Sequence, residues 1–218
     1  MTYQEIKNNP EVKALLKKGD DSLAVLGYTD HSEAHCVLVA ERAAYILRRT
    51  GHSDREEELA RIAGFMHDIG NAVNRSRHAE SGALLAYTIL RETDMPLEDQ
   101  MTVISAIGNH DESTGGAKDA VSAALILADK TDVRRNRVRP QDAKDFDIHD
   151  RVNYAVTGTT LNVLEEKKTI ALNLQIDESI CTMYEYFDIF LERMMMCRQA
   201  AEMLGYQFRL TVNGGKVL

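Results

Sequence analysis

The spacing of apolar residues changes along this chain of 218 residues after the segment VTGTT, which begins at residue 156. Upstream, apolar side chains recur every three or four positions, as over residues 37–47, which is the period of a helix with one buried face. Downstream, residues 170–176 alternate at the two-residue period of a strand. We therefore predict a mainly α protein with a helical domain over residues 1–157 and a small α+β appendage over residues 158–218.

Signals for helix ends divide the first part into several helices. The segment HSEAHCVLVAERAAYILRRTG is expected to form one helix that ends at Gly51. The next helix should begin at Ser53, which stands at capping-box spacing from Glu56, and its last turn should reach His67 and Asp68. Further helices are expected over residues 78–92, 96–110 and 118–135.

The second part combines strands with one long helix. LNVL and TIALNLQI, joined by the charged segment EEKK, should form a hairpin, and YQFRLTV should form a third strand. The intervening helix should stop at Gly205. Its MMMC segment indicates a core or dimer surface remote from the histidines rather than a metal box, and a homodimer through this region stays open.

Composition restricts the compartment and the partners. The net charge of −8 argues against large nucleic acids or anionic membranes as partners. The three cysteines form no CxxC pair, which favours a reducing compartment, and the charged N-terminus does not resemble a signal sequence. We expect a cytoplasmic protein with no membrane span.

The segment AGFMHDIGN places a histidine and an aspartate directly after an apolar run, with Gly70 positioned to let the backbone turn away. Other histidines fall near the ends of expected helices, and one aspartate closes the apolar run AALILAD. Imidazole and carboxylate groups from several helices can together form one metal-binding site. Without a cysteine cluster, such a site suits iron, manganese, cobalt or zinc. The candidate metal ligands are His35, His67, Asp68, His78, His110 and Asp129.

The order His35, His67-Asp68, Asp129, with the closing ADK, resembles the HD-domain superfamily of metal-dependent phosphohydrolases. With His78 and His110 the pattern is similar to its two-metal branch, which includes the HD-GYP phosphodiesterases and the bacterial symmetrical dinucleoside tetraphosphatases. The resemblance covers about residues 28–140 and not the tail. The GYP signature is missing, and Asn71 stands where many relatives carry lysine, which argues against a cyclic dinucleotide substrate.

The resemblance implies an HD-type helical bundle and two divalent transition-metal ions. One ion would be held by His35, His67 and Asp129 together with Asp68, and the other by Asp68 with the remaining two histidines. Asp68 would then be a catalytic carboxylate: it would bridge the two ions, and the ions would activate a water molecule. The expected reaction is hydrolysis of a phosphoester or phosphoanhydride in a small molecule, with a nucleotide or dinucleoside polyphosphate as the leading class.

Charged side chains near these ligands are candidates for binding phosphate or orienting ligands. Lys130, Arg134 and Arg137 are expected at helical spacing on one helix beyond Asp129. The candidate phosphate-binding residues are Arg77 and Lys130, followed by Arg75 and Arg134. The candidate supporting residues are His31, Asp111 and Asp132, and no role is assigned to His52 and His149.

Other interpretations stay open at this stage. Each histidine could pack in the core or cap a helix, and the arginines could be a solvated face paired with acidic residues. Similar HD-type sites also support di-iron oxygenation. A third alternative is a non-catalytic ligand-binding or regulatory protein in which the metal is structural.

Overall fold

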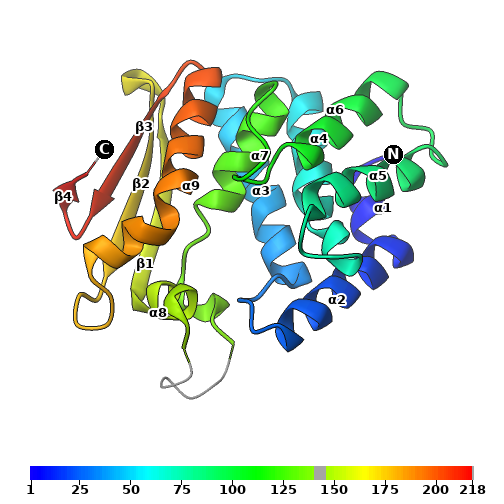
Figure 1. Cartoon of the computed structure of the whole chain (residues 1–218). Helices are drawn as coiled ribbons and strands as arrows, with labels where there is room; N and C mark the ends of the chain where they lie inside the picture. The colour runs from blue at the N-terminus through cyan, green and yellow to red at the C-terminus, as the bar shows by residue number, and fades with distance from the viewer. Residues whose placement is uncertain (140–145, 218) are drawn as a thin grey trace.

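The computed structural model describes residues 1–139 and 146–217. A group of helices forms one side of the molecule, and a four-stranded sheet with one long helix forms the other (Figure 1). The first group comprises α1 (Tyr3–Lys7), α2 (Pro10–Val25), α3 (Glu33–Thr50), α4 (Asp54–Met66), η1 (Ile69–Ala72), α5 (His78–Leu90), α6 (Leu97–Gly108), α7 (Ala120–Lys130) and η2 (Arg135–Arg137). The second comprises α8 (Ile148–Ala155), β1 (Val156–Leu164), η4 (Glu165–Lys167), β2 (Thr169–Ile176), α9 (Met183–Met203), β3 (Gln207–Val212) and β4 (Gly215–Lys216). The prediction of a mainly α fold with a C-terminal α+β appendage is confirmed.

Helices α3 and α4 form the central pair of the helical side, and their ends follow the predicted signals. Helix α3 ends at Gly51, which adopts the left-handed conformation with φ of 87°. Helix α4 begins with the Ser53–Glu56 capping box. The two helices approach so closely that a Cβ on Gly64 would lie 2.7 Å from the Cα of Ala40. The absence of a side chain at residue 64 therefore allows the backbones to touch.

Helix α7 is shorter than predicted. It begins after Asp119, whose side chain accepts a hydrogen bond from the Ser122 amide, and it ends at Lys130. The Thr131 hydroxyl then donates to the Leu127 carbonyl, and the chain turns away. The prediction that Arg134 and Arg137 continue the helical spacing of Lys130 is wrong for this reason.

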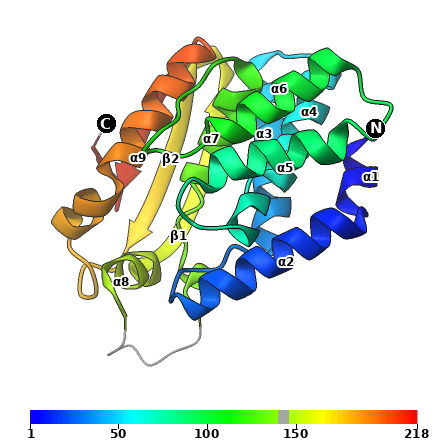
Figure 2. The same cartoon turned by 45° about the vertical axis from the view of Figure 1, so that its right-hand side comes forward.

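The sheet has the order β1-β2-β3-β4. Strands β1 and β2 pair antiparallel as the predicted hairpin, and β3 is the predicted third strand. Because β2 and β3 are parallel, the chain needs a long connection between them, and α9 supplies it. Helix α9 packs against β3 and also against α7 on the helical side (Figure 2).

No helix within residues 1–139 and 146–217 has the length and apolar character that crossing a bilayer requires. The cytoplasmic location stays a prediction.

Gly70, which follows the HDI run, has a structural role different from the one expected. Its φ is not positive, so a left-handed turn does not explain the glycine. A Cβ at this position would instead lie 1.9 Å from the His78 carbonyl oxygen and 2.5 Å from the Gly82 amide nitrogen. The glycine is needed because η1 packs directly on the backbone of α5.

We expect Gly70→Ala to lower the free energy of unfolding by about 1–3 kcal/mol or more, because the new methyl group must displace backbone atoms. The matched control is Gly116→Ala, where a Cβ would meet no atom within 4 Å. Urea denaturation of both variants measures the difference. Equal unfolding free energies for the two variants would contradict the packing argument.

Candidate metal centre

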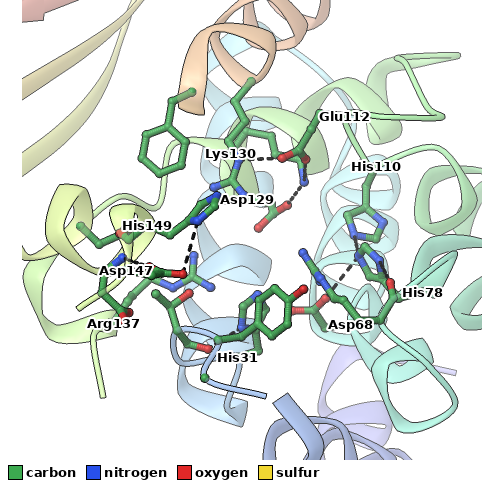
Figure 3. A pocket seen from close by; sticks show the side chains of 18 residues that line it. His31, Asp68, His78, His110, Glu112, Asp129, Lys130, Arg137, Asp147 and His149 are labelled. Carbon is green, nitrogen blue, oxygen red and sulfur yellow. Dashed lines mark hydrogen bonds and ion pairs between the residues drawn. The ribbon is translucent and has the colours of Figure 1, made fainter. Parts of the chain in front are cut away.

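A cavity of about 330 Å³ lies where the ends of several helices converge (Figure 3). Its walls come from segments far apart in the sequence, including the loop after α2, the ends of α6 and α7, helix α8, and α9. Among the lining residues are Asp68, His78, His110 and Asp129. These four candidate ligands therefore face a space that a small molecule can enter, whereas His35 and His67 do not line it.

One group of candidate ligands consists of His35, His67 and Asp129. His35 lies in the first turn of α3, His67 is the residue that caps the end of α4, and Asp129 is in the last turn of α7. The distance from His35 Nε2 to Asp129 Oδ1 is 3.4 Å, and that from His67 Nε2 to the same oxygen is 3.7 Å. Their ligand atoms all lie within 4.8 Å of one another, so the three could bind one ion.

A second group consists of Asp68, His78 and His110, which satisfies the same distance criterion. The Nε2 atoms of the two histidines are 3.2 Å apart, and His78 Nε2 is 3.8 Å from Asp68 Oδ1. The other oxygen of Asp68, Oδ2, is 3.2 Å from His67 Nε2 and 3.9 Å from His35 Nε2. Asp68 therefore lies between the two groups, with one oxygen toward each.

The four imidazoles are oriented through their Nδ1 atoms. Those of His67, His78 and His110 contact the carbonyl oxygen three residues earlier, at 2.8, 3.2 and 2.6 Å. A carbonyl can only accept, so Nδ1 carries the hydrogen and Nε2 presents its lone pair to the interior. His35 Nδ1 lies 2.8 Å from the Asp132 carboxylate, which produces the same orientation.

Three of the atoms at this centre are buried without a hydrogen-bond partner: His35 Nε2, His67 Nε2 and Asp68 Oδ2. Buried polar atoms in folded proteins are normally paired, because an unpaired group loses its hydration without compensation. Two nitrogen lone pairs and a carboxylate oxygen directed at one another cannot satisfy each other. A divalent cation bound among them would satisfy all three, so the residues fit a metal ion.

For His78, His110 and Asp129 the surroundings favour the charge states of metal ligands. Burial and the nearby Lys130 charge lower the pKa of His110 to about 3, and burial also lowers the pKa of His78. Burial would also lower the pKa of His67, but the Asp68 and Asp129 carboxylates and the Gly64 carbonyl raise it overall. Burial would raise the pKa of Asp129, but Lys130, His35 and His67 together outweigh it and hold that pKa well below its ordinary value. Neutral imidazoles and an ionised carboxylate are the forms that bind a cation.

The three candidate supporting residues lie around this centre. Asp132 accepts from His35 and also binds Arg134, whose Nε is 2.6 Å from Asp132 Oδ1. Asp111 Oδ2 is 3.7 Å from His78 Nδ1. The rings of His31 and His35 have centroids 5.8 Å apart, and His31 lines the cavity.

The candidate phosphate-binding residues divide into two pairs. Arg75 and Lys130 line the cavity. Arg77 does not, since its side chain is 78% exposed and lies 3.9 Å from Glu80. Arg134 is also absent from the lining and is engaged with Asp132. The structure brings only the first pair to the cavity.

Several residues at the centre were not expected from the sequence. Phe190 and Arg193 of α9 line the cavity, so the expectation that this helix is remote from the histidines is wrong. Glu112 and His149 also line it. The buried thiol of Cys36 lies within 4.8 Å of ligand atoms of His67 and Asp68, a proximity that its place beside His35 could have signalled.

Lys130, which is buried, and Glu112, which is partly buried, form a charge network beside the ligands. Lys130 Nζ lies 2.7 Å from Glu112 Oε2 and 2.8 Å from Asp129 Oδ2 (Figure 3). Burial alone would raise the pKa of Glu112, but the Lys130 and Arg193 charges outweigh it and lower the pKa. Glu112 is thus held ionised between two cations.

Comparison with known proteins agrees with this geometry. A protein of Methanocaldococcus jannaschii that is described as uncharacterized is 27% identical over 201 residues, which cover 81% of this chain and 75% of the relative. The family model described as HD domain matches residues 33–155, and this range contains all six candidate ligands. The predicted resemblance is confirmed: the chain belongs to the HD domain family, which consists mostly of metal-dependent phosphohydrolases.

Proposed function

We propose that this protein is a metal-dependent phosphohydrolase that acts on a small phosphorylated compound. The observation that carries the proposal is the set of buried, unpaired atoms of His35, His67 and Asp68, which face one point beside an accessible cavity. Membership of the HD domain family supports hydrolysis as the reaction class.

We assign two ions to the centre, because Asp68 presents one oxygen to each of two groups of ligands. His35, His67 and Asp129 would hold the first with Asp68, and His78 and His110 would hold the second with Asp68. Iron, manganese, cobalt and zinc all suit this donor set. When bound, such a pair of ions supplies a water of lowered pKa and polarises a phosphoryl oxygen.

Asn71 connects the ligands to a substrate-binding residue. Its side-chain amide donates to Asp68 Oδ1 at 2.7 Å, and its carbonyl oxygen accepts from Arg75 Nη1 at 3.3 Å. A lysine, which many relatives carry here, could donate to Asp68 but could not accept from Arg75. Asn71 therefore holds the Asp68 carboxylate and the Arg75 guanidinium in one hydrogen-bonded unit.

Arg75 and Lys130 are assigned to the substrate phosphate. They approach the cavity from different elements, and positive charge on two sides of a phosphoryl group stabilises negative charge that develops on its oxygens. Arg75 is free of carboxylate partners at ion-pair distance among the described residues, whereas Lys130 is shared with two carboxylates. Arg75 is therefore the stronger candidate for a direct contact.

For the rest of the substrate, a nucleotide or dinucleoside polyphosphate remains the leading class. Tyr28 supplies aromatic surface to the cavity, and Asn153 supplies hydrogen-bonding groups. Aromatic surface with a few polar groups suits a nucleobase and its sugar.

The phosphohydrolase proposal is tested by phosphate release with Mn²⁺ under anaerobic conditions, across nucleotides, sugar phosphates and dinucleoside polyphosphates. His67→Ala and Asp68→Asn should each lose at least about 100-fold in rate, because even outer partners of metal ligands cost 10–100-fold. The control is His52→Ala, which changes a histidine outside the cavity lining.

Full phosphate release by both variants, shown to be folded by circular dichroism, would contradict the mechanism. Oxygen consumption by an iron-loaded protein without anaerobic phosphate release would instead support the di-iron oxygenase. Ligand-induced thermal stabilisation without turnover of any compound would support a non-catalytic role.

The two-ion assignment predicts the metal content of ligand variants. After equilibration with Mn²⁺ and removal of free ion, the wild-type protein should retain two equivalents, and His110→Ala should retain one. The reason is that His110 offers its ligand atom only to the second group, although its ring also packs against that of His67. Elemental analysis measures the content, and one equivalent in both proteins would contradict the assignment.

The assignment of Arg75 predicts a selective effect on substrate binding. Arg75→Gln should raise KM about tenfold, since a charge-assisted hydrogen bond to phosphate contributes about 1.4 kcal/mol or more. Arg77→Gln is a matched control, because it removes a nearby arginine whose side chain points to solvent. Similar KM values for the two variants in steady-state kinetics would show that Arg75 does not bind the substrate.

A further inference from the structure

Helix α9 lies outside the part of the chain that matches the HD domain family, yet it reaches the metal centre. The match covers residues 33–155, and α9 spans Met183–Met203. It packs against α7, the helix that carries Asp129 and Lys130, and its residues Phe190 and Arg193 line the cavity. A contribution of α9 to the centre is therefore a property of this chain rather than of the matched domain.

A continuous series of ion pairs connects α9 to one of the candidate ligands. Arg193 Nε lies 2.7 Å from Glu112 Oε1, Glu112 Oε2 lies 2.7 Å from Lys130 Nζ, and Lys130 Nζ lies 2.8 Å from Asp129 Oδ2. The two cations bind different oxygens of Glu112, so both contacts can be present together. The charges alternate in sign along the whole series.

The first member of the series is itself held in place. The Arg193 guanidinium lies over the ring of Phe190, with its central carbon 4.7 Å from the ring centroid. Phe190 is 1% exposed, so it offers a fixed surface one helical turn away. This stacking limits the positions that the guanidinium can adopt.

The last member of the series determines which oxygen of Asp129 is free. Lys130 occupies Oδ2, and Oδ1 faces His35 Nε2 at 3.4 Å. If Glu112 lost its contact to Arg193, it would have only Lys130 to neutralise it and would draw the ammonium from Asp129. The Asp129 carboxylate could then rotate away from the histidines.

We propose that Arg193 is a positioning residue of the metal centre: through Glu112 it holds Lys130 against Asp129, and it thereby directs Asp129 Oδ1 toward His35 and His67. The C-terminal appendage is consequently part of the centre. This inference rests on the metal site of the proposed function but not on the hydrolysis of any substrate.

The test is Co²⁺ binding by the full-length protein without substrate, followed by titration of the visible absorption of the bound ion. Arg193→Gln should weaken Co²⁺ binding by about 3–10-fold, less than the 10–100-fold typical of direct partners of metal ligands, because it acts through two further residues. Removing a positive charge near a cation site would by itself strengthen binding. A weaker affinity therefore reports displaced ligands and not a change of local charge.

A double substitution identifies the route of the effect. In a Glu112→Gln protein the series is already interrupted, so adding Arg193→Gln should cause no further weakening. Arg193→Lys, which retains the charge, should recover part of the affinity. Arg198→Gln is the control on the same helix, since Arg198 is 47% exposed in its side chain and pairs with Glu202 instead of the centre.

Three results would overturn the proposal. Unchanged or tighter Co²⁺ binding by Arg193→Gln would show that the series of ion pairs only attaches α9 to the helical domain. The same conclusion would follow if Arg193→Gln weakened Co²⁺ binding equally in the wild-type and Glu112→Gln proteins. A wild-type protein that binds no Co²⁺ would refute the metal centre together with this inference. A wild-type protein that binds Co²⁺ but releases no phosphate would refute only the proposed reaction and would leave the positioning role in place.

Discussion

Burial of the Asp68 carboxylate is the constraint around which the helical domain is arranged. Asp68 is 3% exposed, and the cost of burying an ion without a partner is several kcal/mol. Asn71 donates to one of its oxygens, but the other faces the lone pairs of His35 and His67, which cannot neutralise it. A bound cation would relieve this arrangement, so the packing of this region and its chemistry have the same physical origin.

The backbone at helix ends explains how the imidazoles reach the required orientation. The last carbonyl groups of a helix have no partner within the helix. His67 and His110, which follow α4 and α6, donate from Nδ1 to the Gly64 and Ile107 carbonyls and so satisfy two of these groups. The same hydrogen bonds direct Nε2 inward. Capping a helix and binding a metal are therefore not alternative roles for these two histidines. The same Nδ1 hydrogen bond satisfies a helix carbonyl and turns Nε2 toward the ligand cluster.

The sequence predicted what depends on local spacing and missed what depends on distant contacts. The ends of α3 and the start of α4 follow from residues within a few positions of one another, and the order of histidines and aspartates predicted the centre. The sequence placed Arg77 ahead of Arg75 as a phosphate-binding candidate, but the Arg77 side chain is 78% exposed and does not line the cavity, whereas Arg75 does. Nothing near Arg193 in the sequence indicates Glu112, which is 81 residues away.

The burial of α7 explains why residues beyond the HD domain belong to the centre. The side chains from Ala123 to Ala128 are all 0% exposed, so this helix must be covered on every side. Helices α3, α4 and α6 cover part of it, and α9 covers the remaining side. Without α9, water would reach the Lys130 and Asp129 end of α7 and would weaken the ion pairs there by raising the local dielectric constant. The change of apolar period near residue 157 therefore marks a change of secondary structure. The site itself includes residues from both sides of this position.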